Sequence, residues 1–155
     1  MQGIRIGEIL IEQGILSAEQ VSHILKVQRS VTRPFGDLAE RLYGIDPKAV
    51  EDAWVEQYVR WAPPVDLSEI EADKQVLRLI NRRQAWQFHI APLGRDTENI
   101  SIATTAERLV RAVNFAAEKF SQPVSFVLAD KKQLREFLMK HYPVPNFIAE
   151  FAETF

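Results

Sequence analysis

The sequence contains no cysteine, which excludes disulfide bonds, thiolate metal sites and a cysteine nucleophile. Its three histidines, His23, His89 and His141, are far apart and lack the spacing of metal ligands. The sequence has no phosphate-binding GxxxxGK[ST] loop and none of the enzyme motifs GxSxG, HExxH and GxGxxG. No nucleophile stands in a pattern with a base. We therefore expect a protein that is not an enzyme and that needs no metal or cofactor.

The chain also lacks an excess of either charge and a long apolar run. Its 155 residues carry a net charge of −2, so no general positive field attracts polymeric nucleic acid. A small anionic ligand needs only a local site. In the N-terminal stretch MQGIRIGEIL, Arg5 and Glu8 interrupt the apolar residues, unlike a secretory signal or a membrane span. We expect a cytoplasmic protein that does not insert into a membrane.

The most informative feature is a pattern that occurs twice. RIGEILIEQGILSAEQVSHILKVQ, residues 5–28, aligns without a gap on PFGDLAERLYGIDPKAVEDAWVEQ, residues 34–57. A shift of 29 positions places Gly7 on Gly36 and Gln28 on Gln57. Each copy of such a repeat is usually one supersecondary unit that cannot bury its apolar face alone. The two copies therefore predict a paired unit.

Each copy predicts two helices separated by a glycine. In copy one, Gly14 is expected to end the first helix in a left-handed conformation, and Ser17 with Gln20 forms a capping box for the second. In copy two, Gly44 ends the first helix, and Asp46 followed by Pro47 begins the second, which runs to Trp61. We expect two antiparallel helical hairpins.

A second region follows the sequence Ala-Pro-Pro at 62–64, which cannot continue a helix. We predict a helix from about 73 to 80, a short turn or helix at 82–88, a hairpin of strands at 89–93 and 99–104, a helix at 106–120, a strand at 125–129 and a helix at 131–141. The last strand should join the sheet in parallel after a helical crossover.

The predicted fold class is thus α+β. An N-terminal four-helix unit made of two repeated helical hairpins, residues 1–61, is joined by a linker, 62–66, to a small α/β unit, 67–142, with a three-stranded sheet in the order α-β-β-α-β-α. The tail, 143–155, is expected to form a short helix. Its apolar stripe consists of Phe147, Ile148, Phe151 and Phe155. This stripe either docks on its own domain or presents aromatic anchors to a partner.

Copy one resembles the cyclic di-GMP-binding repeat of MshEN-type domains, whose pattern runs RLGxxLVxxGxIxxxxLxxALxxQ. The identical positions include Arg5, Gly7, Leu10, Gly14 and Gln28. Residues 65–142 resemble the second N-terminal subdomain of type II secretion ATPases, through a helix followed by APLGRD, a strand and a terminal helix that ends near a tyrosine. Together the two resemblances cover nearly the whole chain, up to about Tyr142.

The resemblance implies particular partners. In type II secretion and type IV pilus assembly ATPases, such N-terminal domains precede a hexamer-forming ATPase and dock on an inner-membrane platform component. The ATPase part is not present in this sequence, so the resemblance implies a free-standing sensor or adaptor that pairs with an ATPase or another machine. A homo-oligomer is also compatible with it.

The resemblance also implies a ligand site, but copy two departs from the pattern. Pro34 replaces the leading arginine, and Gly44 follows one position late. A cyclic dinucleotide needs donors for two phosphates and flat surfaces for two bases. The residues that could supply these are Arg5, Ile6, Gly7, Leu10, Gly14, Gln28, Arg33, Phe35, Gly36 and Gln57. Alternatively, the glycines serve helix packing and the glutamines bridge the two hairpins.

Two functions follow. The leading hypothesis is a non-catalytic protein-interaction or regulatory module related to the N-terminal domains of secretion and pilus ATPases. The alternative is a cyclic di-GMP receptor that binds the nucleotide through the first repeat.

Overall fold

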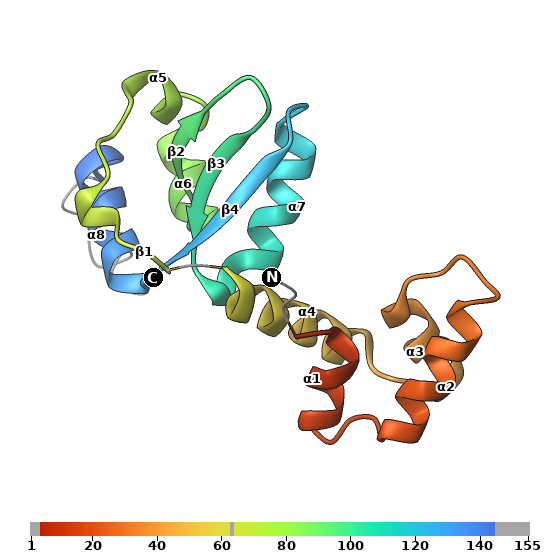
Figure 1. Cartoon of the computed structure of the whole chain (residues 1–155). Helices are drawn as coiled ribbons and strands as arrows, with labels where there is room; N and C mark the ends of the chain where they lie inside the picture. Colours follow the sequence, from red (N-terminus) through yellow and green to blue (C-terminus); the bar gives the residue numbers. More distant parts are fainter. Residues whose placement is uncertain (1–3, 63, 145–155) are drawn as a thin grey trace. The chain divides into compact units, whose positions relative to one another are not determined.

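The computed structural model describes residues 4–62 and 64–144 (Figure 1). The chain separates into two compact units, Met1–Trp61 and Ala62–Phe155. The predicted tail anchors Phe147, Ile148, Phe151 and Phe155 lie outside the described residues. None of the described helices combines the length and the apolar composition that crossing a membrane requires.

The first unit contains the four predicted helices. Its capping chemistry is as expected, because Ser17 Oγ accepts a hydrogen bond from Gln20 N at 3.1 Å and Gln20 Oε1 accepts one from Ser17 N at 2.8 Å. Gly14 and Gly44 have φ values of 71° and 62°, the left-handed conformation that glycine adopts without strain. The helices are α1 (Ile6–Glu12), α2 (Ala18–Gln28), α3 (Phe35–Tyr43) and α4 (Pro47–Trp61).

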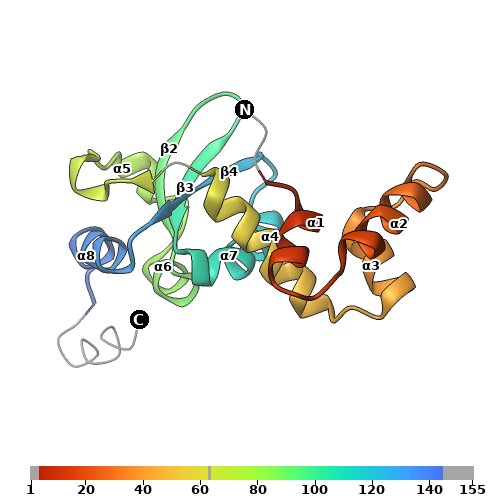
Figure 2. The ribbon, with the colours of Figure 1, turned by 60° about the horizontal axis from the view of Figure 1, so that its bottom comes forward.

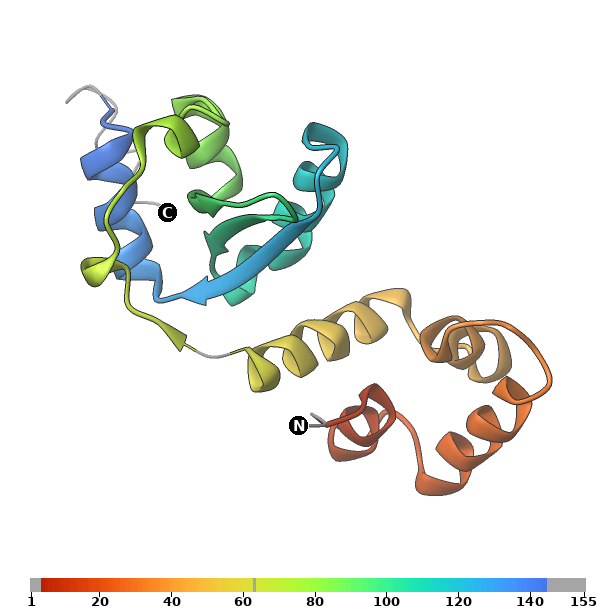
Figure 3. The same cartoon turned by 45° about the horizontal axis from the view of Figure 1, so that its top comes forward.

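The helices of the first unit pair mainly between the two copies. Helix α1 lies alongside α4, and α2 lies alongside α3 (Figure 2, Figure 3). The contacts between α1 and α2, and between α3 and α4, are fewer. We expected two antiparallel helical hairpins that pair with each other. Each helix of copy one has its main partner in copy two, so the two copies form one paired unit.

The core of the first unit confirms this pairing. It combines buried residues from all four helices and the α1–α2 turn: Ile9, Leu10, Leu16, Val21, Ile24, Leu38, Ala39 and Ala53. At the position of Leu10, copy two has Ala39, and both side chains are fully buried. Because neither copy encloses these residues alone, burial of the apolar area couples the folding of the two copies.

The second unit has the predicted α+β architecture with one additional strand. The strands are β1 (Pro64–Val65), β2 (Ala91–Arg95), β3 (Ile100–Thr104) and β4 (Val124–Ala129). The helices are α5 (Lys74–Leu77), α6 (Arg82–Phe88), α7 (Leu109–Lys119) and α8 (Lys131–His141), with 3-10 turns at Leu67–Glu69 and Ala106–Arg108. The short turn at 106–108 replaces the first turn of the helix predicted from residue 106.

The sheet has the order β1-β4-β3-β2. Strands β2 and β3 form the predicted antiparallel hairpin, with an irregularity between Pro92 and Gly94, and β3 pairs with β4 in parallel. The additional strand, β1, lies in the predicted linker and pairs in parallel with the end of β4, Pro64 opposite Leu128. Proline lacks an N–H group and is tolerated at the edge of a sheet, where this donor is not needed.

Residue His89 begins no strand, although we expected one there. It is the C-cap of α6 and has a left-handed φ of 52°. Its backbone carbonyl accepts a hydrogen bond from the Thr104 hydroxyl at 2.8 Å, which ties the helix end to β3. Helix α6 also contacts α7, and the two lie side by side below the strands in the view of Figure 2.

The end of α8 is fixed to the helices that precede the sheet. The indole of Trp86 donates a hydrogen bond to the carbonyl of Tyr142 at 2.8 Å, and the Tyr142 hydroxyl donates one to the carbonyl of Leu77 at 2.5 Å. Burial raises the pKa of Tyr142, so this hydroxyl stays protonated and remains a donor. These two bonds hold the end of α8 against α5 and α6.

Candidate functional site

A cavity of about 450 Å³ opens in the first unit where the two copies of the repeat meet. We call it the central cavity. It is lined by six of the residues expected from the sequence, Arg5, Ile6, Gly7, Gln28, Phe35 and Gln57, together with Glu8, Val21 and Leu25. Residues from α1, α2, α3 and α4 thus converge on one site. Two of the lining pairs, Ile6 with Phe35 and Gln28 with Gln57, occupy equivalent positions of the repeat.

Arg5 and Glu8 are the charged residues of this lining. Arg5 is the N-cap of α1 and is exposed, and its backbone N–H donates a hydrogen bond to Glu8 Oε2 at 3.3 Å. Among the described residues, no carboxylate forms an ion pair with the Arg5 guanidinium. A guanidinium at the mouth of a cavity can bind a phosphate through two parallel hydrogen bonds. Arg5 is therefore suited to hold an anionic group.

The two glutamines hold the repeat together in equivalent ways. Gln28 Nε2 donates a hydrogen bond to the carbonyl of Arg33 at 3.1 Å, and Gln57 Nε2 donates one to the carbonyl of Ile4 at 3.1 Å. Each carboxamide uses an N–H group in this bond and keeps its oxygen as an acceptor. The bridging role that we considered for the glutamines is thus present, and both glutamines also line the cavity.

The helical glycines allow close packing between helices. A Cβ atom at Gly7 would lie 3.0 Å from Val21 Cγ1 and 3.2 Å from Phe35 Cζ. A Cβ atom at Gly36 would lie 2.5 Å from Val50 Cγ1. Both glycines therefore serve helix packing, and Gly7 also lets the ring of Phe35 approach the floor of the cavity.

Four residues predicted for the site do not line the central cavity. Leu10 is fully buried in the core, and Gly14 forms the left-handed turn after α1. Gly36 contacts the second helix of its own copy through Val50. Arg33 lines a separate hollow of about 490 Å³ formed by residues 28–34, which we call the loop hollow. Their part in binding stays a prediction.

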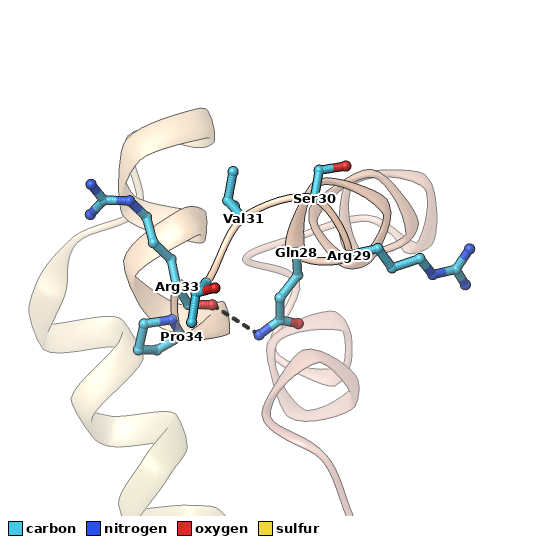
Figure 4. A pocket seen from close by; sticks show the side chains of 7 residues that line it. Gln28, Arg29, Ser30, Val31, Arg33 and Pro34 are labelled. Carbon is cyan, nitrogen blue, oxygen red and sulfur yellow. Dashed lines mark hydrogen bonds between the residues drawn. The ribbon is translucent and has the colours of Figure 1, made fainter.

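In the loop hollow, the arginines do not converge on one point. Figure 4 shows the Arg33 guanidinium directed away from Gln28, and Arg29 extending to the opposite side of the loop. Arg33 Nη1 and Arg41 Nε both contact Asp37 Oδ2, at 3.1 and 3.0 Å. The hydrogen bonds from these guanidinium groups lower the pKa of Asp37. Arg33 is thus engaged at the surface of α3.

A third hollow, of about 250 Å³, shares Gln57 with the central cavity. Its lining is mainly aromatic and consists of Ile4, Trp54, Gln57, Tyr58 and Trp61. The ring centroids are 6.2 Å apart between Trp54 and Tyr58, and 5.6 Å apart between Tyr58 and Trp61. Trp61 is 60% exposed. This aromatic hollow offers apolar surface beside the cavity.

Glu8 is one of the three lining residues that the sequence analysis did not assign to the site. It follows Arg5 by three positions, the spacing of a capping residue, and an acidic residue in the first turn also interacts favourably with the helix dipole. This signal could have placed Glu8 next to Arg5. Val21 and Leu25 lie four positions apart on α2, a spacing that indicates one helix face but does not show that this face borders a cavity.

The described residues include no group of three or more His, Asp or Glu side chains that could hold a metal ion. The central cavity has one acidic and one basic side chain, and its other polar groups are carboxamides and backbone atoms. This set of groups can bind a ligand through hydrogen bonds, charge and stacking.

Comparison with solved structures found similar chains, of which MshE supports the observed fold. A solved structure of MshE with cdg, an abbreviation for cyclic di-GMP, is 24% identical, with a TM-score of 0.51 over 90% of this chain and 99% of that one. A structure of the N-terminal domain of XpsE is 16% identical, with a TM-score of 0.46 over 91% of this chain and 98% of that one. No curated protein sequence matches the chain.

The sequence model of the MshEN domain matches residues 60–146, which is more than half of the chain. This match covers the α/β unit and not the helical repeat. The resemblance of the repeat to a cyclic di-GMP-binding pattern therefore rests on the residues of the repeat alone. The chain belongs to the MshEN domain family.

Proposed function

We propose that this protein is a non-catalytic regulatory module whose helical unit binds a nucleotide and whose state is read by a protein partner. The observation that carries the proposal is the central cavity, which brings Arg5, Phe35 and both glutamines of the repeat to one place. Regulation fits this arrangement because the cavity lies between the two copies. A ligand there contacts all the helices whose mutual packing forms the unit.

The chemistry of the lining suits a nucleotide. The Arg5 guanidinium can bind a phosphate, and the half-buried ring of Phe35 offers a flat apolar surface for a base. The carboxamide oxygens of Gln28 and Gln57 can accept hydrogen bonds from the amino groups of a base. The related structure of MshE contains cyclic di-GMP, which supports a ligand of this class.

Calorimetric titration tests the nucleotide site. Wild-type protein is titrated with cyclic di-GMP and, separately, with GMP, and the same titrations are repeated with Arg5→Ala. We expect binding of a nucleotide that is weakened by about tenfold or more in Arg5→Ala, because a charge-assisted hydrogen bond is worth about 1.5–3 kcal/mol.

Arg29→Ala is the matched control for Arg5→Ala. Arg29 is also exposed and lies in the same unit, but it lines the loop hollow and not the central cavity. The two variants have the same net charge, so only the position of the lost guanidinium differs. Absence of heat with both nucleotides, or equal weakening in the two variants, would refute the site.

A protein partner is the second part of the proposal. The family resemblance suggests a secretion or pilus assembly ATPase, or an inner-membrane platform component, and the location would then be cytoplasmic. The exposed Trp61 beside Trp54 and Tyr58 supports a contact surface, because aromatic residues at partly exposed sites are typical anchors of interfaces. The role of the tail stays a prediction.

Pull-down with wild-type protein and with Trp61→Ala tests this part. We expect recovery of a secretion or pilus component by the wild type and a reduced yield with the variant. Arg29→Ala, in the loop hollow, again serves as the control for surface changes elsewhere. Recovery of the protein's own copy alone would favour a homo-oligomer, and recovery of no such component would refute the proposed partner.

A further inference from the structure

The correspondence between the two copies of the repeat can be followed into the central cavity residue by residue. Two pairs of equivalent positions, Ile6 with Phe35 and Gln28 with Gln57, both line the cavity. The two glutamine bonds are equivalent as well, because the acceptor residues Ile4 and Arg33 are also 29 positions apart. A ligand with two identical halves would therefore meet equivalent positions of the two copies.

The residues at those positions are not equivalent in chemistry. The position of Arg5 in copy one is that of Pro34 in copy two, which lines the loop hollow, and Arg5 is the one arginine in the lining of the central cavity. The neighbouring Arg33 does not replace it, because its guanidinium contacts Asp37 and is directed away from Gln28 (Figure 4). A second phosphate would meet no arginine of copy two in this lining.

A flat surface for a base is also provided by one copy only. The ring of Phe35 lines the cavity, and a Cβ atom at Gly7 would be only 3.2 Å from it. Its equivalent in copy one is Ile6, whose branched side chain cannot stack on a base. The cavity is thus lined by one arginine and one aromatic ring. The equivalent position in the other copy is a proline for the arginine and an isoleucine for the ring.

We infer that the central cavity prefers a ligand with a single phosphate group and a single flat ring, of the nucleoside monophosphate class, over a two-fold symmetric cyclic dinucleotide, and that Pro34 determines this preference. The inference rests on the proposed nucleotide-binding function of the same cavity. It adds the class of ligand and a residue that selects it.

The backbone at Pro34 makes a direct test feasible. Pro34 has φ and ψ of −60° and 150°, and Arg5 has −85° and 153°. Both residues precede the first turn of a helix, and both carbonyls accept a 3.2 Å hydrogen bond, Arg5 from Ile9 and Pro34 from Leu38. Because Pro34 is exposed and arginine adopts this extended conformation freely, Pro34→Arg should place a second guanidinium at the equivalent position without disturbing α3.

The experiment is a calorimetric titration of wild type and Pro34→Arg with GMP and with cyclic di-GMP. We expect the wild type to bind GMP more tightly than cyclic di-GMP. In Pro34→Arg, the affinity for cyclic di-GMP should rise by about tenfold, while that for GMP should change by less than about threefold, because one phosphate already has its arginine. Pro47→Arg, at an exposed helix start outside the cavity, controls for added charge.

The outcomes separate the two claims. If the wild type binds cyclic di-GMP more tightly than GMP, or if Pro34→Arg raises both affinities equally, the inferred preference is wrong although the cavity binds nucleotides. If neither ligand binds the wild type or Pro34→Arg, the proposed nucleotide site itself is wrong. Circular dichroism and a thermal melt of each variant establish that the substitution leaves the helical unit folded.

Discussion

The side-chain amide of Gln57 donates a hydrogen bond to the backbone carbonyl of Ile4 at 3.1 Å, joining the last helix of the repeat to the residue that precedes its first helix. Gln28 makes the equivalent bond to Arg33. The final glutamine of each copy therefore holds the beginning of the other copy. Because both carboxamides also line the central cavity, the residues that hold the repeat together are the ones that a ligand would contact.

Replacement of Gln57 by leucine should destabilise the first unit more than the same change at Gln28. The Gln57 bond is partly buried, and its loss should lower the free energy of unfolding by about 1 kcal/mol. The Gln28 bond is exposed, so water can replace it and the loss should be smaller. Urea unfolding followed by circular dichroism measures both. A larger effect at Gln28 would show that burial does not set the strength of these bonds.

Gly36→Ala should destabilise the protein although alanine favours helices. The new Cβ atom would lie 2.5 Å from Val50 Cγ1, and such overpacking costs about 1–3 kcal/mol, more than the gain in helix propensity of about 1 kcal/mol. Combining Gly36→Ala with Val50→Ala removes the clash. In urea unfolding, the double variant should be more stable than the sum of the single changes predicts by about 1 kcal/mol. Additive effects would mean that the two helices move apart to accommodate the new Cβ atom without loss of stability.

Local chemistry made much of the first unit predictable. The capping box of Ser17 and the left-handed glycines are set by residues close in sequence, and these features formed as expected. The glycine of copy two comes one position late because α3 continues through Tyr43, whose hydroxyl contacts His23 Nδ1 of α2 at 2.5 Å. That shift in the pattern can be seen in the sequence, but its reason lies in the pairing of α2 with α3.

Features that depend on distant partners were not predictable in the same way. Strand β1 has two residues, too few to show an alternating pattern, and it forms because the end of β4 offers a free edge. Hydrophobic periodicity likewise does not show which helices of the two copies contact each other, because it indicates a buried face but not the element that covers it. In the candidate site, the same periodicity could have assigned Leu10 to the core, where it is fully buried.

Gly44→Ala should cost stability because of backbone conformation alone. Gly44 has a φ of 62°, and a Cβ atom there would meet nothing within 4 Å, so no clash contributes. An L-residue in this conformation costs about 1–2 kcal/mol, and asparagine tolerates it better than alanine. Thermal unfolding should therefore rank Gly44→Ala below Gly44→Asn, with wild type highest. Gly94→Ala, which also meets open space, is the control in which no left-handed residue is replaced.

His89 should make the stability of the protein depend on pH below neutrality. The residue is 8% exposed, and burial, with smaller contributions from the positive charges of Arg108, Lys131 and Arg111, lowers its pKa from 6.5 to about 4. Between these values the unfolded chain binds a proton at His89 and the folded chain does not. The free energy of unfolding therefore falls as the pH is lowered from about 6.5 to about 4, and this contribution stays constant below that range.

His89→Asn isolates this contribution, because asparagine does not titrate and tolerates the left-handed backbone at this position. Urea unfolding of both proteins at several pH values from 4 to 8 gives the difference in their free energies of unfolding. The wild type should lose about 1–2 kcal/mol relative to the variant as the pH falls from 7 to 4, after allowance for solvent screening. A difference that does not change with pH would mean that His89 takes up its proton equally well in the folded chain.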